Sequence, residues 1–265
     1  PAGIAVEDHV LGGVPAQVYR PEGAGPRPAV LYSHGGGWVL GGPDTHGDMC
    51  AEIAAATGCV VVLVDYRLAP EHRHPAQLDD VAAVLAVLRR DGAALGTDPA
   101  RIVGAGDSAG GQLTAGLSLR LRDQGLAPLA GQVLIYPTLD VDLTRPSYIR
   151  NADAPCLTRA EMVYFLESFL GPRGGANWSD PYALPLRAAS LAGLPPAFVT
   201  VAGHDPLHDD GVAFHERLIA AGVASELRRE PALAHSYMRA RHVSAPAMAG
   251  FAAIAGAIAA FAHGG

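Results

Sequence analysis

Short runs of β-branched and other apolar residues alternate along the chain with longer stretches in which apolar residues recur at helical spacing. The short runs predict strands over residues 16–20, 29–33, 60–64, 101–104, 131–136, 197–201 and 225–229. The longer stretches predict helices over residues 46–56, 78–89, 109–124, 159–170, 206–221 and 245–261. Several strand runs are almost wholly apolar, which is typical of parallel strands covered by helices on both faces.

This alternation predicts an α/β fold with one open, mostly parallel central sheet and helices on both of its faces. The length of 265 residues fits a single domain spanning residues 1–265. Residues 140–185 break the rhythm and are richer in Pro, Asn, Trp and Tyr, which predicts a cap-like insertion over one sheet edge. In such sheets functional residues gather at the carboxyl ends of the strands, so these ends are the place to look for chemistry.

The amino-acid composition and net charge exclude several classes of protein and of chemistry. Apolar residues make up 49% of the chain and charged residues 17%, which excludes a disordered chain. The net charge of −7 argues against a nucleic-acid partner. The sequence contains no lysine, which excludes Schiff-base chemistry and a phosphate-loop lysine.

Cysteines and hydropathy bear on the cellular setting. The three cysteines have no metal-ligand spacing and predict buried thiols in a reducing compartment, with no metal site and a cytoplasmic location. The alanine-rich end, residues 245–262, comes closest to a membrane span, but Gly250 and Gly256 interrupt it. We interpret it as a buried terminal helix and expect no membrane span.

The first chemical motif is Gly106-Asp107-Ser108-Ala109-Gly110, which follows a predicted strand and opens a predicted helix. A sharp turn in this position points the serine hydroxyl out of the sheet, where it can act as a nucleophile. The pentapeptide alone is a weak signal, since about 0.15 such matches are expected by chance in a chain of this composition. The strand–turn–helix context strengthens it.

The second motif is the run of three glycines after His34, at the carboxyl end of the strand predicted at 29–33. Adjacent glycines leave backbone N–H groups unobstructed. Two of them, from Gly35 and Gly36, together with that of Ala109, are expected to form an oxyanion hole. A flexible glycine turn is the alternative interpretation, and His34 is expected to shape this loop.

A serine nucleophile needs a base and a residue that orients the base. Asp205 and His235 each follow a predicted strand, and the order Ser108, Asp205, His235 is that of α/β-hydrolases. Asp205 has an alternative role as the cap of the helix predicted from residue 206. Other candidates are weaker: Asp209 and Asp210 are expected on a solvated helix face, and His204 and His208 lie beside the acid.

Residues 104–109 also match the G-x-G-x-x-A pattern of dinucleotide-binding folds. That fold needs an acidic residue at the end of the next strand. Here the next strand runs into Pro137 and Thr138, and the first acid, Asp140, comes too late. The sequence therefore argues against nucleotide binding, and we expect no cofactor.

Taken together, five motifs resemble the hormone-sensitive lipase family of bacterial carboxylesterases: His34–Gly37, residues 66–71, residues 106–111, Asp180-Pro181-Tyr182 and Asp205-Pro206-Leu207. The resemblance runs from about residue 15 onward. It implies an α/β-hydrolase fold with Ser108 as nucleophile, Asp205 as acid and His235 as base. It implies Gly35, Gly36 and Ala109 as oxyanion donors, and Glu71 as a structural residue in a supporting ion pair.

The chain departs from the family pattern in two places. The family usually has Gly-Phe after its histidine, whereas Ser236 and Tyr237 follow His235 here. Since serine lacks glycine's freedom at positive φ, this predicts a loop of different shape. The family also begins with some tens of residues of cap helices, whereas strand-like sequence starts almost at once here, which predicts a reduced or missing N-terminal cap.

These patterns predict a carboxylesterase that hydrolyses short-chain acyl esters through an acyl-enzyme, without cofactor or metal. An amidase or arylformamidase would use the same residues, and a non-catalytic ligand receptor on this fold is a further alternative. The expected partners are a small-molecule ester and, through pairing of the strand at 225–229, a second copy in a homodimer. The substrate pocket is expected to involve Trp38, Leu40, Tyr66, Asp107 and Tyr237.

Overall fold

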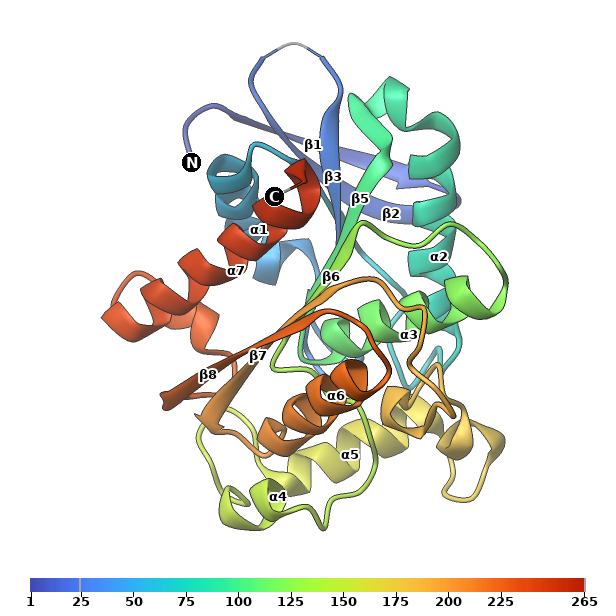
Figure 1. Ribbon diagram of the computed structural model, residues 1–265, viewed down its shortest axis with the longest axis vertical. Coiled ribbons are helices and arrows are strands. Elements are labelled where there is room, and N and C mark those ends of the chain that lie inside the picture. The colour runs from blue at the N-terminus through green and yellow to red at the C-terminus, as the bar shows by residue number, and fades with distance from the viewer. Residues whose placement is uncertain (24, 265) are drawn as a thin grey trace.

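A computed structural model describes residues 1–23 and 25–264, and within them eight strands form one sheet (Figure 1). The strands are β1 (Ile4–Leu11), β2 (Val14–Pro21), β3 (Arg27–Ser33), β4 (Val60–Val64), β5 (Thr97–Asp107), β6 (Gly131–Ile135), β7 (Ala197–His204) and β8 (Ser225–Ala234). Their order across the sheet is β1-β2-β4-β3-β5-β6-β7-β8. The six strands from β4 to β8 in this order are parallel, while β1 and β2 pair antiparallel. The predicted α/β class is confirmed.

All seven predicted strands are present, with β5 and β8 longer than expected. Strand β1 was not predicted, because its sequence carries Glu7, Asp8 and His9 in a row. Those charges are tolerated because β1 is the edge strand and most of it is exposed. A pattern of buried apolar residues therefore finds the inner strands and misses this one.

The helices are α1 (Pro43–Thr57), α2 (Ala76–Asp91), α3 (Ala109–Asp123), α4 (Pro146–Arg150), α5 (Arg159–Leu170), α6 (His208–Ala220) and α7 (Ala245–His263). Short 3₁₀ turns lie at η1 (Gly92–Leu95), η2 (Ala176–Ser179), η3 (Pro185–Arg187) and η4 (Tyr237–Ala240). The six predicted helices are confirmed, and the single-turn α4 is additional. Helices α1 and α7 cover one face of the sheet, and α2, α3 and α6 cover the other (Figure 1).

The central strands explain why no polar alternation was visible in their sequences. In β4, Val61 and Leu63 pack toward α1 and α7, while Val62 and Val64 pack toward α2 and α3. All five residues of the strand are buried. Each such side chain contributes about 1.5–3 kcal/mol by leaving water. Burial on both faces therefore fixes the strands whose ends carry the site.

Helix α7 alone among the described helices is long and apolar enough to cross a membrane by length and composition. In this fold one side of it, including Ile254 and Ile258, packs on the sheet. The expectation of a buried terminal helix holds only for that side, since a third (33%) of the apolar window is buried and Met248 is 55% exposed. Near its end, His263 Nε2 lies 2.9 Å from the Thr57 carbonyl oxygen of α1.

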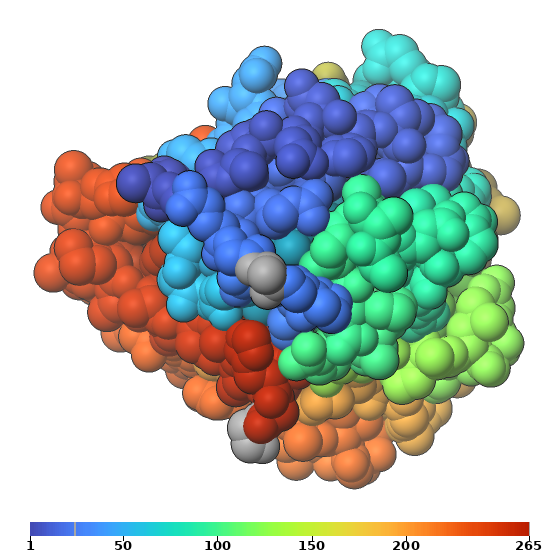
Figure 2. All heavy atoms as spheres, turned by 90° about the horizontal axis from the view of Figure 1, so that it is seen from above, coloured from blue at the N-terminus to red at the C-terminus, as the bar shows by residue number. Residues whose placement is uncertain are grey.

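The segment between β6 and β7 covers one end of the molecule, and the opposite end is formed by other elements. Figure 2 shows the end where the start of β3, η1 (green) and the last turn of α7 (red) meet. At the opposite end lies the connection from β6 to β7, whose residues 139–187 include α4, α5, η2 and η3 (Figure 1). This is the segment whose composition predicted an insertion, and several of its residues line the cavity described next.

Candidate active site

Ser108 lies in the turn between β5 and α3, with a backbone conformation of φ 54° and ψ −116°. A non-glycine residue rarely adopts a positive φ, so the turn is strained, as sites of chemistry often are. The glycines around it permit the turn. A Cβ at Gly110 would lie 1.9 Å from the Ser33 carbonyl oxygen, and one at Gly106 would lie 2.4 Å from the Gly110 carbonyl oxygen. This packing explains why the motif needs glycine at both positions.

The loops after β7 and β8 bring an acid and an imidazole to this serine. His235 Nε2 lies 3.0 Å from Ser108 Oγ, and His235 Nδ1 lies 2.8 Å from Asp205 Oδ2. All three side chains are buried, at 7% exposure for Ser108, 4% for His235 and 0% for Asp205. The other carboxylate oxygen, Asp205 Oδ1, accepts the N–H of Leu207 at 2.8 Å. The same carboxylate therefore orients the imidazole and closes the turn before α6.

The other candidate acids and bases are engaged elsewhere. His208 Nδ1 lies 2.9 Å from the Ala202 carbonyl oxygen, and His204 is exposed. His34 shapes the glycine loop, since its Nδ1 donates to the Gly35 carbonyl oxygen at 2.8 Å. Burial lowers the pKa of His34 to about 4, so its ring is neutral at pH 7.

The glycine loop differs in one respect from the sequence expectation. The Gly35 N–H donates to Asp107 Oδ1 at 3.1 Å, so it is already engaged. Among the described residues, the N–H groups of Gly36 and Gly37 have no acceptor, and neither has that of Ala109 at the start of α3. Three backbone N–H groups near the nucleophile turn therefore remain without an acceptor, from Gly36, Gly37 and Ala109.

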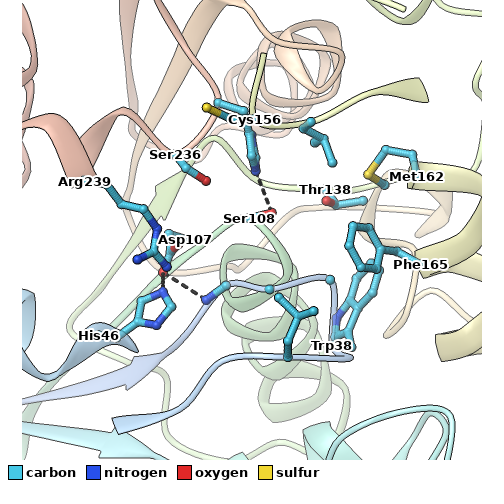
Figure 3. Close-up of a pocket in the computed structure, with 16 residues that line it drawn as sticks. Trp38, His46, Asp107, Ser108, Thr138, Cys156, Met162, Phe165, Ser236 and Arg239 are labelled. Carbon is cyan, nitrogen blue, oxygen red and sulfur yellow. Dashed lines mark hydrogen bonds and ion pairs between the residues drawn. The ribbon is translucent and has the colours of Figure 1, made fainter. Parts of the chain in front are cut away.

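Asp107, the residue before Ser108, forms hydrogen bonds that hold the glycine loop next to the turn that carries the serine. Its Oδ1 accepts the Tyr32 hydroxyl at 2.9 Å as well as the Gly35 N–H, and His46 Nε2 lies 3.4 Å away (Figure 3). Burial alone would raise the pKa of Asp107, but His46 and the hydrogen bond from Tyr32 outweigh it and lower the pKa to about 2. The carboxylate is therefore charged and holds the first glycine of the loop.

A cavity opens above Ser108 and His235 (Figure 3). Trp38 and Leu40 line it, as expected, and so does Asp107. The facing wall comes from the segment between β6 and β7, through residues that the sequence did not single out: Cys156, Leu157, Met162 and Phe165. Their only sequence signal was the change of composition over residues 140–185.

Two expected pocket residues lie beneath the cavity instead. Tyr66 is 1% exposed, stacks on the His34 ring at 4.1 Å, and donates its hydroxyl to the His34 carbonyl oxygen at 2.7 Å. Tyr237 packs edge-on against Tyr136 and donates to Thr200 Oγ1 at 3.1 Å. Both expectations are corrected, because both hydroxyls turn into the protein, where buried polar groups need partners.

Three further expectations are modified. Glu71 is exposed and forms no ion pair with any described residue, so the supporting pair expected for it is absent there. Cys156 is exposed at the cavity, whereas Cys50 and Cys59 are buried as expected. Ser236 adopts a left-handed conformation of φ 59° and ψ 24°, so serine does not force this loop out of the region that glycine favours.

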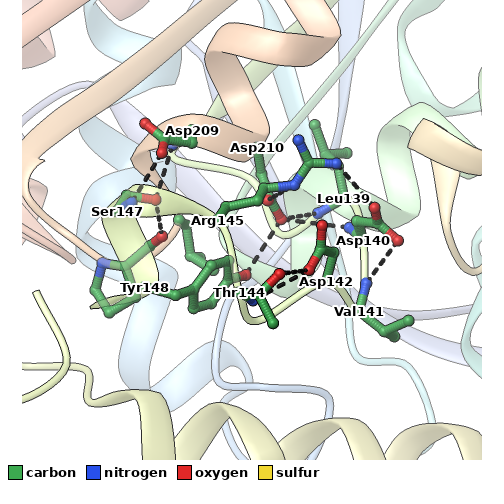
Figure 4. Close-up of polar contacts among 12 residues, drawn as sticks. Leu139, Asp140, Val141, Asp142, Thr144, Arg145, Ser147, Tyr148, Asp209 and Asp210 are labelled. Carbon is green, nitrogen blue, oxygen red and sulfur yellow. Dashed lines mark hydrogen bonds and ion pairs between the residues drawn. The ribbon is translucent and has the colours of Figure 1, made fainter. Parts of the chain in front are cut away.

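Asp210, expected on a solvated helix face, is fully buried beneath the segment between β6 and β7 (Figure 4). Its Oδ2 accepts the Leu139 N–H at 3.0 Å, the Asp140 N–H at 3.3 Å and the Tyr148 hydroxyl at 3.2 Å. Arg145 Nε lies 3.4 Å from Oδ1. Burial raises the pKa of Asp210 to about 7. The solvated-face interpretation is therefore wrong for this residue.

Further charged side chains also join the segment between β6 and β7 to α6 or brace it internally. Asp209 accepts the Ser147 N–H at 2.8 Å at the start of α4. Asp140 pairs with Arg145 and with Arg187, each at 2.9 Å (Figure 4 labels all but Arg187). Residues 139–148 are thus joined to α6 immediately after the loop that carries Asp205.

Comparisons with known proteins show the family to which this chain belongs. Residues 30–239 match the family model of the α/β-hydrolase fold. The chain is 46% identical over 230 residues to the carboxylesterase NlhH of Mycobacterium tuberculosis, covering 85% of this chain and 71% of that one. It is 37% identical to the ethyl acetate hydrolase of Pseudomonas putida, covering 85% of this chain and 72% of that one. The solved structure of a bacterial heroin esterase superposes with a TM-score of 0.93 at 34% identity, covering 98% of this chain and 85% of that one.

Proposed function

On the premise that this chain belongs to the α/β-hydrolase fold family and is a carboxylic ester hydrolase, we propose that Ser108, His235 and Asp205 form its catalytic triad. The observation that carries the proposal is the continuous chain of contacts at the cavity: 3.0 Å from serine to imidazole and 2.8 Å from imidazole to carboxylate. Both distances are within hydrogen-bond reach, as a nucleophile and its base require.

The mechanism follows from these positions. His235 takes the proton of Ser108 as its Oγ attacks the ester carbonyl, and then gives the proton to the leaving alcohol. Water hydrolyses the resulting acyl-enzyme by the same route in reverse order. Asp205 holds Nδ1 as the protonated nitrogen, so that Nε2 faces the serine as an acceptor.

The oxyanion is stabilised by backbone N–H groups. We assign this role to Gly36, Gly37 and Ala109, because the Gly35 N–H is already donated to Asp107. Such fixed donors act in a site with little water, where each contributes about 10²–10³ in kcat. Gly35 keeps an indirect role by fixing the loop from its first residue.

The substrate is proposed to carry a short acyl chain. Trp38, Met162 and Phe165 wall one end of the cavity, and each methylene that fits there adds about 0.8 kcal/mol until the wall is reached. We therefore expect kcat/KM on p-nitrophenyl esters to peak at about two to six acyl carbons and to fall steeply by about twelve, where clash outweighs burial.

The test combines labelling with a substrate panel. A fluorophosphonate probe should modify Ser108 alone, as identified by peptide mass spectrometry, and the panel should show the short-chain peak. Labelling at another residue would overturn the triad, and a preference for sixteen-carbon esters would overturn the short pocket. An anilide matched to its ester distinguishes the amidase alternative, which is favoured only if the anilide is the better substrate.

We also propose a homodimer formed through β8, the last strand of the sheet. The exposed side of the neighbouring helix α7 offers apolar surface, including Met248, for such a contact. Glu226, Arg228 and Arg229 on β8 oppose it, since charged edge strands resist pairing. Sedimentation at micromolar concentration tests this, and a species of 27.3 kDa would overturn it.

A further inference from the structure

The cavity has two ends of different chemistry, on opposite sides of Ser108 (Figure 3). One end is apolar and is walled by Trp38, Met162 and Phe165. The other end is polar and is lined by His46, Ser236 and Arg239. An ester has two sides, an acyl side and an alcohol side, so the two ends receive different halves of one substrate.

Arg239 is the cation of the polar end. It lies in η4, four residues after His235, so the loop that carries the base also carries this side chain. Its hydrogen bond is a long one, from Nη1 to the Thr45 carbonyl oxygen at 3.4 Å. Within the described residues its guanidinium forms no ion pair, whereas Arg241 nearby is paired with Asp48 and Glu52, each at 2.7 Å.

The carboxylates closest to this end form no ion pair with Arg239, although its charge helps to lower the pKa of Asp48. Asp107 is buried and already holds the Tyr32 hydroxyl and the Gly35 N–H, with His46 beside it. Asp48 belongs to the pair with Arg241. Among the described residues that line the cavity, Arg239 is the one arginine, and the one acid, Asp107, is occupied by the contacts named above. The guanidinium of Arg239 is therefore the group at the polar end that can donate hydrogen bonds to an anionic part of a substrate.

We propose that Arg239 binds a carboxylate of the substrate, so that the preferred substrates are esters that carry a carboxylate on one side of the scissile bond. This inference rests on the proposed function, because it names the substrate class of the same site. A guanidinium presents a planar pair of N–H donors that matches a carboxylate. Arg239 is exposed, so the contact contributes selectivity of a few-fold rather than most of the binding.

The experiment compares charged esters with neutral isosteres. On the acyl side the pair is ethyl hydrogen succinate and ethyl succinamate, and on the alcohol side it is acetoxyacetate and acetoxyacetamide. For each enzyme the measured quantity is the ratio of kcat/KM between the charged and the neutral ester. We expect this ratio to be about three- to tenfold lower in Arg239→Gln than in the wild type, in one of the two pairs. Arg239→Lys keeps the positive charge but loses the planar pair of N–H donors, so its ratio should lie between those of the wild type and Arg239→Gln.

A matched control separates this contact from the charge of the whole molecule. Arg90→Gln removes the same charge from α2, where Arg90 is exposed and pairs with Asp91, and it should leave the ratio at the wild-type value. The wild-type ratio should also fall as salt rises from about 0.02 to 0.3 M, and that of Arg239→Gln should not. Equal ratios in the wild type and Arg239→Gln for both pairs overturn the inference while neutral esters are still hydrolysed. Loss of hydrolysis of every ester by the wild type would instead overturn the proposed function.

Discussion

The floor and the roof of the cavity are held by different kinds of interaction. The floor consists of the loops at the ends of β3, β5, β7 and β8, which carry the glycine loop and the proposed triad. It is fixed by strand pairing and by glycines whose positions admit no side chain, as at Gly110. The roof is the segment of residues 139–187, which is attached to α6 through the carboxylates of Asp209 and Asp210.

The difference has a physical consequence. Backbone pairing and close packing do not titrate, and the Asp107 carboxylate that holds the glycine loop has a pKa of about 2, so it stays charged near pH 7. The roof is attached through Asp210, whose pKa is about 7, and through ion pairs that salt screens. The two parts meet where the Phe165 ring lies against Gly37, so closely that a Cβ at Gly37 would be 2.4 Å from the ring. Changes in the floor should therefore affect the chemical step, and changes in the roof should affect selectivity and stability.

The largest expected effect comes from the floor. Ser108→Ala should lower kcat by about 10⁵ or more, because it removes the proposed nucleophile. His235→Ala should be similar, and the double variant should be scarcely worse, since the residues act as a unit. Steady-state kinetics on p-nitrophenyl butyrate measures this. Substantial turnover by purified Ser108→Ala would contradict the account of the floor.

The second effect concerns the contact between Asp107 and the glycine loop. Asp107→Ala leaves the Gly35 N–H without its acceptor, so kcat should fall by about 10- to 100-fold with KM changed by less than about threefold. Asp107→Asn is the matched control, because it keeps an acceptor oxygen, and it should retain more activity than the alanine variant. If both variants lost affinity for substrate and kept kcat, the loop would not depend on this carboxylate.

The third effect is on selectivity and comes from the roof. Phe165→Ala removes an apolar wall, so kcat/KM for octanoate relative to butyrate should rise by about three- to tenfold. Tyr164→Ala serves as the control, because Tyr164 is 56% exposed on the same helix and does not line the cavity. An unchanged chain-length profile in Phe165→Ala would mean that the acyl chain lies elsewhere.

The smallest effect concerns stability and pH. Because burial raises the pKa of Asp210 to about 7, the folded protein holds a proton there that the unfolded chain releases near pH 4. Wild-type stability therefore falls at this site as pH rises from about 4 to 7. Asp210→Asn resembles the protonated form, so its free energy of unfolding relative to the wild type should increase over that range. Urea denaturation at pH 5 and pH 7.5 measures this, and a constant difference between the two proteins would contradict it.

The sequence predicted the floor better than the roof. Ser108, Asp205 and His235 were each singled out because they follow an apolar strand, and the structure brings them together because strand ends meet at one edge of a parallel sheet. The direction of single N–H groups was beyond this reasoning, since the bond from Gly35 to Asp107 joins residues 72 positions apart. Local patterns do not carry such long-range pairings.

The roof was visible only as a change of composition. The burial of Asp210 depends on its contacts with residues 139–148, about 60 to 70 positions away in the chain. From the helix pattern alone an aspartate in the first turn of α6 resembles an exposed residue, because the covering segment has no periodic signal of its own. Strand β1 was missed for the converse reason, since an exposed edge strand carries charges that resemble a loop.

The position of His235 after β8, the last of the described strands in chain order and the last in the sheet, has a consequence for biosynthesis. A nascent chain that has emerged as far as α6 holds the serine and the acid of the proposed triad without its base. The part of the sheet face that α7 covers also stays open to water until that helix is made. On the proposed mechanism, hydrolytic competence thus arises only after β8 and His235 have been made, and translation products interrupted before that point are inert toward the cell's esters.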